Sequence, residues 1–340
     1  MRQTHLGDSS LSEMRILVTG ATGFIGRRFC EKYHDRDRIV AAYRDPKQLE
    51  MFSDFNVETV QLDLRNPGSI VTAMNQADSC LHLAAMAQPW AKDESQFFKI
   101  NVEGTRLVLQ SALDAKINRV VFVSTAGVFG PSGHDDAITE ASPMPTQLGT
   151  SYEQSKRECE SVVQKYQNRG LDVVSVYPTR VFGPGRLSSS NSITKVIKQV
   201  ADKSWKFIPG DGSAIGNYVF VDDLVDGLMQ CFLNPSPSPK YLLGGENLNF
   251  HDFFEAIQSA VGDHRKLIRI PYWVIRAKAY WEMTKTFFTK RPPEITPAFV
   301  TKYSRDYKID CSRAIQELDY RPRNFADGLR RTVDWLNSRN

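Results

Sequence analysis

The stretch MRILVTGATGFIG, from Met14 to Gly26, constrains the fold of this chain more than any other. It opens with Ile16 to Val18, a short apolar run of the kind that forms a buried parallel strand. Glycines at three-residue spacing then make a turn, and the apolar periodicity that starts at Phe24 predicts a helix. The first turn of a helix presents free N–H groups and partial positive charge, so a diphosphate is its natural occupant. The order strand, glycine turn, helix therefore predicts a nucleotide site.

Each glycine of this turn meets a separate physical need. Gly20, Gly23 and Gly26 allow a tight turn, close approach of the backbone to a phosphate, and close packing of helix on strand. Their spacing is Gly-x-x-Gly-x-x-Gly, and because glycines also mark ordinary turns, the position between strand and helix carries the prediction. The cofactor contacts expected here are Gly20, Thr22, Gly23, Phe24 and Ile25.

The composition is that of an ordinary folded protein. The chain has 340 residues, of which 41% are hydrophobic and 24% charged, enough for one large or two modest domains with a sizeable core. The formal net charge of +4 is too small to indicate a nucleic-acid partner. Five cysteines at no metal-like spacing favour free thiols in a reducing, cytoplasmic compartment, and we expect no metal site. No apolar run approaches the length of a spanning helix, and we expect residues 1–13 to be a disordered lead without a signal peptide.

Predicted strands and helices alternate after the glycine turn. The strand-like runs cover 38–43, 57–62, 79–83, 119–124 and 171–177, and the strongest helical patterns cover 97–112 and 151–168. Such alternation predicts an α/β fold with a doubly wound parallel sheet, in which ligands bind beyond the carboxyl ends of the strands. Further along, 178–185 and 208–212 are expected to be turns, and Asp222 or Asp223 is expected to cap a helix.

The residues after the second strand bear on the choice of dinucleotide. In such folds an acid at this point bonds the free 2′-hydroxyl of NAD, whereas an arginine accommodates the 2′-phosphate of NADP. Arg44, with Lys47, favours NADP, although a solvated charged turn is the structural alternative. NAD stays the alternative cofactor, because a shift of one residue would bring Asp45 to the site.

Other strand ends offer further contacts with a cofactor. Asp63 could accept from the adenine amino group or cap the next helix, and small residues after the fourth strand would let the backbone approach the dinucleotide. We expect His82, within that strand, to be a packed core histidine. The contacts expected at these strand ends are Asp63, Leu64, Leu83, Ala84 and Ala85.

One pair of side chains has the spacing and the chemistry for proton transfer. Tyr152 and Lys156 are four residues apart on a predicted helix, so they share one face, and the helix starts near the strand end at Thr125. A solvent-facing pair is the structural alternative. Reducing a ketone by hydride leaves an alkoxide that needs a proton, and an ammonium beside a phenol lowers its pKa from about 10. We expect Tyr152 to act as acid or base, Lys156 to lower its pKa and hold the nicotinamide ribose, and Thr125 to donate to the carbonyl oxygen.

With these residues the sequence resembles the extended short-chain dehydrogenase/reductases, also called the NAD-dependent epimerase/dehydratase family. The matching stretches, in the family's order, are TGATGFIG at Thr19, LDL at Leu62, HLAA at His82, NVEGT at Asn101, VSTAGVFG at Val123, YEQSK at Tyr152, YPTRVFGPG at Tyr177 and FVDD at Phe220. The family implies a Rossmann-type cofactor domain, a smaller C-terminal substrate domain and a Ser/Thr-Tyr-Lys catalytic set.

The resemblance also implies boundaries and roles. The Rossmann domain would span 14–180 and regain 214–245, leaving 181–213 and 246–340 for a mostly helical substrate domain. Asn101 would lie near the nicotinamide, and the catalytic hydroxyl would be Thr125, with Ser124 as the fallback. The family suggests a homodimer through the helices over 97–112 and 151–168. The cofactor contacts implied on the YPTRV stretch are Tyr177, Pro178, Thr179 and Val181.

Within the family, the residues favour one branch. Ala126 and Gly127 stand where sugar-nucleotide dehydratases carry an Asp-Glu pair, which argues against dehydration. The Arg44-Asp45-Pro46 turn and the tail resemble dihydroflavonol reductases and 3β-hydroxysteroid dehydrogenase-like proteins. We therefore expect an NADP-dependent oxidoreductase that interconverts a ketone and a secondary alcohol on a largely apolar small molecule. The alternatives are a sugar-nucleotide epimerase with tightly held NAD, and a dinucleotide-binding regulatory protein without turnover.

The aromatic segment 271–290 leaves three interpretations open. It could wall an apolar substrate pocket, or it could be ordinary core. Because Trp, Tyr and Phe alternate there with Lys and Arg, it could also be a helix in peripheral contact with a membrane surface.

Overall fold

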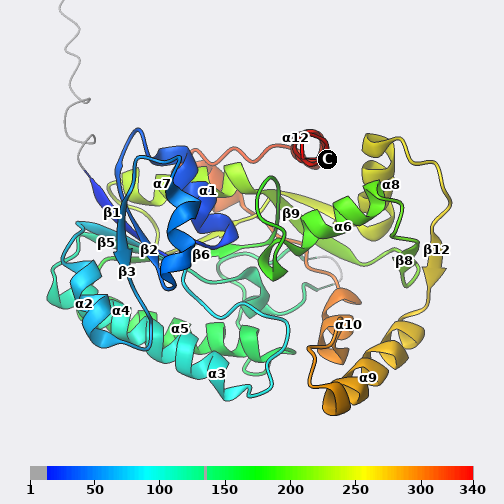
Figure 1. The fold of residues 1–340 in the computed structure, drawn as a ribbon, viewed down its shortest axis with the longest axis horizontal. Helices are drawn as coiled ribbons and strands as arrows, with labels where there is room; N and C mark the ends of the chain where they lie inside the picture. Colours follow the sequence, from blue (N-terminus) through cyan, green and yellow to red (C-terminus); the bar gives the residue numbers. More distant parts are fainter. Residues whose placement is uncertain (1–13, 134–135, 340) are drawn as a thin grey trace, which may run out of the picture.

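The computed structural model describes residues 14–133 and 136–339, so the predicted lead over 1–13 lies outside the described residues. Its main sheet has seven parallel strands in the order β10-β6-β5-β4-β1-β2-β3 (Figure 1). The strands are β1 (Arg15–Thr19), β2 (Arg38–Tyr43), β3 (Glu58–Gln61), β4 (Ser79–His82), β5 (Arg119–Val123), β6 (Val173–Pro178) and β10 (Lys240–Leu243). The predicted doubly wound α/β sheet is confirmed.

Apolar residues alternate between the two faces of this sheet. In β1, Ile16 and Val18 pack into the core under α1 (Phe24–Tyr33), α7 (Val221–Leu233) and α11 (Ser312–Leu318), whereas Leu17 packs into the core on the other face. Both faces are covered by helices, so the strands read as continuous apolar runs in the sequence. The helices of the second face are α2 (Pro67–Met74), α4 (Gly104–Asp114) and α5 (Ser151–Gln167).

The predicted helix over 97–112 has a different internal structure from an ordinary α-helix. It begins as α3 (Ser95–Phe97), continues as a π-helical segment, η2 (Phe98–Glu103), and becomes α4. Such π segments occur often at functional sites because they turn one side chain out of the regular helical register. Here Asn101 lies in the π segment and is buried.

A smaller layer is built from the second half of the chain. The strands β7 (Arg180–Phe182), β9 (Ile215–Phe220) and β11 (Glu246–Asn249) form one sheet, and β8 (Phe207–Pro209) pairs with β12 (Ile268–Ile270). The predicted turns over 178–185 and 208–212 therefore contain short strands, which the local pattern missed because their pairing partners are distant in sequence. The helices here are α6 (Ser192–Ala201), α8 (Phe250–Val261), α9 (Tyr272–Thr289), α10 (Pro297–Tyr303) and α12 (Phe325–Asn337), and the remaining short helical turns are η1 (Pro46–Phe52), η3 (Ala126–Phe129) and η4 (Ser189–Asn191).

The chain passes between the two layers more than once. Within 214–245, β10 belongs to the main sheet and α7 packs against one face of that sheet, whereas β9 pairs with β7 and β11. Conversely, Ile309, Leu318 and Tyr320 in the C-terminal part pack into the core of the main sheet. None of the described helices combines the length and apolar character needed to cross a bilayer.

The prediction that Asp222 or Asp223 caps α7 is wrong. The helix begins directly after Phe220, which makes no side-chain capping bond. Asp222 accepts instead from Arg28 of α1, with its Oδ1 2.5 Å from Nε, and Asp223 accepts from Arg323, with 2.9 Å between Oδ1 and Nε. Both carboxylates lie in the first turn of α7, where they complement the helix dipole while their ion pairs join α7 to α1 and to the segment before α12.

Candidate active site

A cavity of about 960 Å³ lies at the carboxyl ends of β1, β4, β5 and β6. One wall comes from the segments that follow these strands, β2 and β3 and from the start of α5, and it carries most of the predicted cofactor contacts. These are Gly20, Thr22, Gly23, Phe24, Ile25, Arg44, Asp63, Leu64, Leu83, Ala84, Ala85, Tyr152, Lys156, Pro178, Thr179 and Val181. The opposite wall comes from residues 189–195 and 293–303.

The glycine turn has the geometry that a diphosphate needs. Gly20 has a φ of +72°, and a Cβ there would lie 2.8 Å from the backbone nitrogen of Ala84. A Cβ on Gly26 would lie 2.4 Å from the carbonyl oxygen of Gly20, so these two positions have no room for a side chain. Helix α1 starts after Gly23 without a side-chain cap, which leaves its first N–H groups facing the cavity for an anion. The residues present therefore fit a dinucleotide.

The turn after β2 presents an arginine to the cavity and keeps its acid away. Arg44 is exposed on the cavity wall, whereas the carboxylate of Asp45 caps η1 by accepting from the backbone N–H of Lys47 at 3.0 Å. Asp45 therefore does not occupy the position where an acid would bond a ribose hydroxyl. Lys47 itself does not line the cavity, because it lies in the first turn of η1, after the chain has left the strand end.

Asp63 lies on the cavity wall but already has a partner. Arg65 donates to both of its oxygens, at 3.0 Å from Nε and 2.6 Å from Nη2, and these bonds lower the pKa of Asp63 to about 2. The helix after Asp63 is capped by Asn66, so the capping alternative is wrong. Arg65 also lines the cavity, and the sequence analysis missed it because it follows the LDL stretch and carries no motif signal of its own.

The three predicted catalytic residues line the same cavity. Thr125 lies just beyond β5 as the N-cap of η3, and its oxygen accepts from the backbone N–H of Gly127 at 3.2 Å, which leaves its own O–H free to donate. Tyr152 and Lys156 lie one turn apart on α5, which Thr150 caps by accepting from the N–H of Glu153. Ser124, the fallback hydroxyl, lines the cavity as well.

Burial governs the protonation of the tyrosine and the lysine. It raises the pKa of Tyr152 above its usual value, and the negative charge of Glu153 raises it further. The expected lowering of this pKa by Lys156 is therefore not found in the protein alone. The Lys156 Nζ donates to the carbonyl oxygen of Val123 at 2.8 Å and lies 4.5 Å from the centre of the Phe122 ring, and burial lowers the pKa of Lys156. A neutral phenol is the form that can donate a proton to a carbonyl oxygen.

Two other predicted cofactor residues lie behind the cavity wall. The Asn101 Oδ1 accepts from the N–H of Met86 at 2.7 Å, and its Nδ2 donates to the Ser155 hydroxyl at 2.9 Å, so Asn101 joins a wall segment to α5. Tyr177 is fully buried, and its hydroxyl donates to Glu160 at 2.6 Å. Neither side chain lines the cavity, so the predicted direct contacts of Asn101 and Tyr177 are corrected to supporting positions.

His82 is a core histidine, as predicted. Its Nδ1 atom lies 2.8 Å from the Thr19 hydroxyl oxygen, and its Nε2 atom lies 3.1 Å from the Thr105 hydroxyl oxygen. Complete burial, with a smaller effect of the Lys156 charge, lowers the pKa of His82 to about 3. The ring is therefore neutral near pH 7 and supports the end of β4, where the N–H of Ala84 donates to Thr19.

The second wall contains site residues that sequence reasoning missed. Ile193, Ile295 and Phe299 supply apolar surface, and Ser189, Ser190 and Lys195 supply polar surface. Lys302 of α10 also lines the cavity and forms an ion pair with Glu153, next to Tyr152, with 2.5 Å between Nζ and Oε1. Nothing in the local sequence around 302 indicates this contact, since its partner lies far away in the chain.

The aromatic segment does not build the site. The cavity wall begins at Pro293, and none of the described residues in 271–290 lines it. Trp273, Trp281 and Phe287 are 73%, 60% and 81% exposed, so the pocket-wall and core interpretations of this segment are both wrong.

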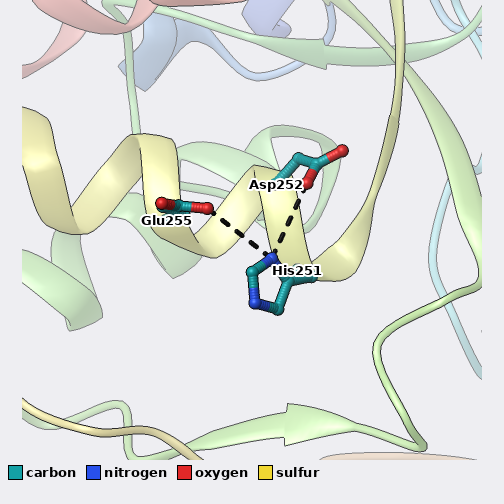
Figure 2. Close-up of side chains that lie close together, drawn as sticks. All are labelled: His251, Asp252 and Glu255. Carbon is teal, nitrogen blue, oxygen red and sulfur yellow. Dashed lines mark ion pairs between the residues drawn. The ribbon is translucent and has the colours of Figure 1, made fainter.

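One group of potential metal ligands occurs among the described residues, outside the cavity. His251, Asp252 and Glu255 lie at the start of α8, and Figure 2 shows the imidazole between the two carboxylates. The Nδ1 atom is 3.6 Å from an oxygen of each acid, and all three side chains are exposed. These are neighbours within one helical turn, and their contacts are those of surface ion pairs.

Comparison with known proteins agrees with this architecture. The chain is 27% identical to sterol demethylase protein B of Methylococcus capsulatus, over 96% of this chain and 99% of that protein. It is 26% identical to 3beta-hydroxysteroid-dehydrogenase/decarboxylase isoform 1 of Arabidopsis thaliana, over 95% of this chain and 80% of that protein. Among solved structures, UDP-glucose 4-epimerase from Thermotoga maritima has the same fold, with a TM-score of 0.78, 18% identity and coverage of 96% and 99%.

The family assignment has its own support in the sequence. The model of the NAD dependent epimerase/dehydratase family matches residues 16–244, about two thirds of the chain and the whole stretch from the glycine turn to the end of β10. The chain therefore belongs to the NAD dependent epimerase/dehydratase family and is an NAD(P)-dependent enzyme of the extended short-chain dehydrogenase/reductase type.

Proposed function

We propose that this enzyme interconverts a ketone and a secondary alcohol on a largely apolar small molecule, with NADP as the hydride carrier and Tyr152 as the acid or base. The observation that carries the proposal is the shared cavity. The diphosphate-type glycine turn, the hydroxyl of Thr125 and the Tyr152–Lys156 pair all line it. A hydride donor held on that turn would face groups that can hydrogen-bond and protonate a carbonyl oxygen.

The roles of the residues follow from their contacts. The glycine turn and Arg44 would hold a dinucleotide, which when bound supplies or accepts the hydride. In reduction, Tyr152 gives its proton to the substrate oxygen while Thr125 donates a hydrogen bond to it as negative charge develops. In oxidation, Tyr152 would accept the hydroxyl proton as a phenolate, a form that a bound cationic nicotinamide and the ammonium of Lys156 would together favour against the effect of burial. Arg44 supports NADP because its guanidinium lies on the cavity wall while Asp45 is engaged in capping η1.

The second wall supports an apolar substrate. Ile193, Ile295 and Phe299 face the cavity across from the catalytic residues. Two of the similar proteins carry sterol or steroid in their names, so a polycyclic ketone or alcohol is the first substrate class to test.

The decisive test replaces the phenol. The Tyr152→Phe protein should bind NADPH as the unaltered enzyme does and lose at least about a hundredfold in kcat on a 3-ketosteroid or 3β-hydroxysteroid. The matched control is Tyr166→Phe on the same helix, whose hydroxyl contacts Gln110 away from the cavity and whose loss should leave kcat unchanged. Full activity of Tyr152→Phe would refute the assignment.

A sugar-nucleotide epimerase with tightly held NAD is the second candidate. It is favoured by the polar part of the second wall, where Ser189, Ser190 and Lys195 could bind a substrate diphosphate. Purified protein that releases NAD on denaturation, and that changes the stereochemistry of a UDP-hexose without consuming NADPH, would replace the first proposal with this one.

A further inference from the structure

Helix α9 exposes a continuous aromatic face. Trp273, Tyr280, Trp281, Phe287 and Phe288 are 60% to 81% exposed, although side chains of this size are usually buried. Trp273, Tyr280 and Phe287 are each seven residues apart, which places them on one line along the helix, and Trp281 and Phe288 lie beside that line. The result is an apolar stripe about four turns long that faces away from the protein.

Basic residues outnumber acids around this stripe, although Lys278 forms an ion pair with the exposed Glu294 and Lys285 forms one with Glu282. Arg276 and Lys278 flank it on opposite sides, and Lys285 continues the second flank, with its Nζ 5.2 Å from the centre of the Trp281 ring. Lys290 and Arg291 follow at the end of the helix and are exposed. The single acid within α9, Glu282, is buried on the opposite face of the helix, where it pairs with Lys285, so Arg276, Lys290 and Arg291 supply the surplus positive charge.

Helix α9 packs against the rest of the protein through its inner face, which leaves its outer, aromatic face exposed. Ala279, Glu282 and Thr286 are its buried residues, and α9 packs mainly against the short helix α10. Figure 1 shows α9 at the lower right edge of the molecule, far from the main sheet. The helix is thus held on one side only, and no described residue of the chain covers its aromatic face.

The segment that follows α9 leads directly into the substrate wall. Pro293, Ile295 and Thr296 lie between α9 and α10 and line the cavity, and α10 supplies Phe299 and Lys302. The end of α9 is therefore only a few residues along the chain from the cavity wall, so a surface that binds α9 would lie close to that wall.

We propose that α9 is an interfacial helix that binds the surface of an anionic membrane, with its aromatic stripe among the lipid chains and its basic flanks against the headgroups. Tryptophan and tyrosine prefer this boundary because their rings are apolar and their N–H or O–H groups stay hydrated. Lysine and arginine beside them extend toward lipid phosphates. Seated in this way, the helix places the 293–303 wall of the cavity at the membrane surface, where an apolar substrate concentrates. A second copy of the chain would also cover apolar rings, but the surplus positive charge of Arg276, Lys290 and Arg291 would repel the same charges on that copy.

The test is co-sedimentation of the full chain with lipid vesicles. The unaltered protein should pellet with vesicles of phosphatidylcholine and phosphatidylglycerol and bind much less to phosphatidylcholine alone. Arg276→Gln/Lys290→Gln, at two exposed positions, should weaken binding to the anionic vesicles about fivefold for each charge removed. Lys165→Gln/Lys266→Gln removes the same charge from exposed positions elsewhere and should have little effect.

A second pair of variants tests the aromatic stripe. Trp273→Ser/Phe287→Ser should weaken vesicle binding about tenfold or more, whereas Val71→Ser/Ile315→Ser, at apolar side chains that are 47% and 50% exposed elsewhere, should not. All four replaced side chains are exposed, so the variants should fold, and retained NADPH binding checks this independently of the membrane result.

Two outcomes would overturn the proposal. The first is an unaltered protein that stays in the supernatant with anionic vesicles. The second is a dimer that Trp273→Ser/Phe287→Ser converts to monomer without any vesicle binding, since a second copy would then be the occupant of the stripe. Neither outcome bears on the hydride-transfer proposal, because none of the residues replaced in these variants lines the cavity.

Discussion

The ion pair between Glu153 and Lys302 should hold the substrate wall against the catalytic helix. Glu153 follows Tyr152 on α5, its side chain is only 3% exposed, and its other oxygen accepts from the Thr150 hydroxyl at 2.8 Å. Lys302 comes from α10 and is 24% exposed. Gly127 makes room for the carboxylate, since a Cβ there would lie 2.4 Å from the Glu153 Oε1.

The burial of the two partners sets the expected magnitudes. Lys302→Ala leaves a buried carboxylate with the Thr150 hydroxyl as its remaining partner, and losing one member of such a pair costs about 3 kcal/mol. Glu153→Gln keeps the shape and the Thr150 contact while the lysine can turn to water, so it should cost about 1 kcal/mol. The double variant leaves no buried charge and should cost no more than Glu153→Gln. This order of stabilities corresponds to a coupling free energy of about 3 kcal/mol between the two positions, which is the result expected for a buried ion pair.

Urea unfolding of the three variants, followed by tryptophan fluorescence, measures these free energies. The control is Lys198→Ala, whose ion pair with Asp202 spans one helical turn with 36% and 44% of the side chains exposed and should contribute about 0.5 kcal/mol or less. If Lys302→Ala is no more destabilising than Lys198→Ala, or if the double variant is the least stable of the set, the reasoning from burial fails.

The other predictions concern the cofactor and acid pH. Arg44→Ala should weaken NADPH binding about tenfold with little effect on NADH binding, because it removes one exposed charge-assisted contact with the 2′-phosphate. Lys47→Ala, outside the cavity wall, should change neither affinity. Titration with both dinucleotides measures these affinities, and an unaltered protein that already prefers NADH would contradict the assignment of NADP. His82 binds a proton below about pH 6.5 in the unfolded chain but only near pH 3 in the fold, so between these values the unfolded state holds the extra proton and stability falls as the pH is lowered. Replacing it by His82→Gln should make the pH dependence of the unfolding free energy shallower by up to about 1.4 kcal/mol per pH unit in that window, and urea titrations at several pH values that give parallel curves would contradict the neutral buried ring.

Much of the nucleotide side of the site could be predicted because its determinants are close together in the chain. The strand, the glycines and the helix from Arg15 to Tyr33 act on one another within a few residues, and Gly20 is required by local backbone geometry. The positions of Arg44 and Thr125 just after predicted strands, and of Tyr152 and Lys156 on one helix face, could be inferred from the periodicity of apolar residues. Because parallel strands bring their carboxyl ends to one edge of the sheet, these residues were expected to line one cavity, as they do.

Predictions about individual side chains failed where a distant partner competed for them. Asp222 and Asp223 had the local chemistry of a helix cap, but Arg28 and Arg323 bind them more strongly than backbone N–H groups do. Asn101 and Tyr177 carry motif signals, yet buried hydrogen bonds to Ser155 and Glu160 direct them behind the cavity wall.

The alternation of strands and helices in the first half of the chain, the glycine turn and the positions of the tyrosine, lysine and threonine along the chain depend on neighbouring residues, so the amino-acid sequence alone indicates them. The second wall of the cavity, the Glu153–Lys302 contact and the outward aromatic stripe of α9 depend on which segments meet after the chain has folded. Glu153 and Lys302, for example, are nearly 150 positions apart in the chain. The energies of such contacts arise from burial and charge pairing between surfaces that no local pattern describes. For that reason only the tertiary structure shows where a substrate would enter and which face of the molecule remains uncovered.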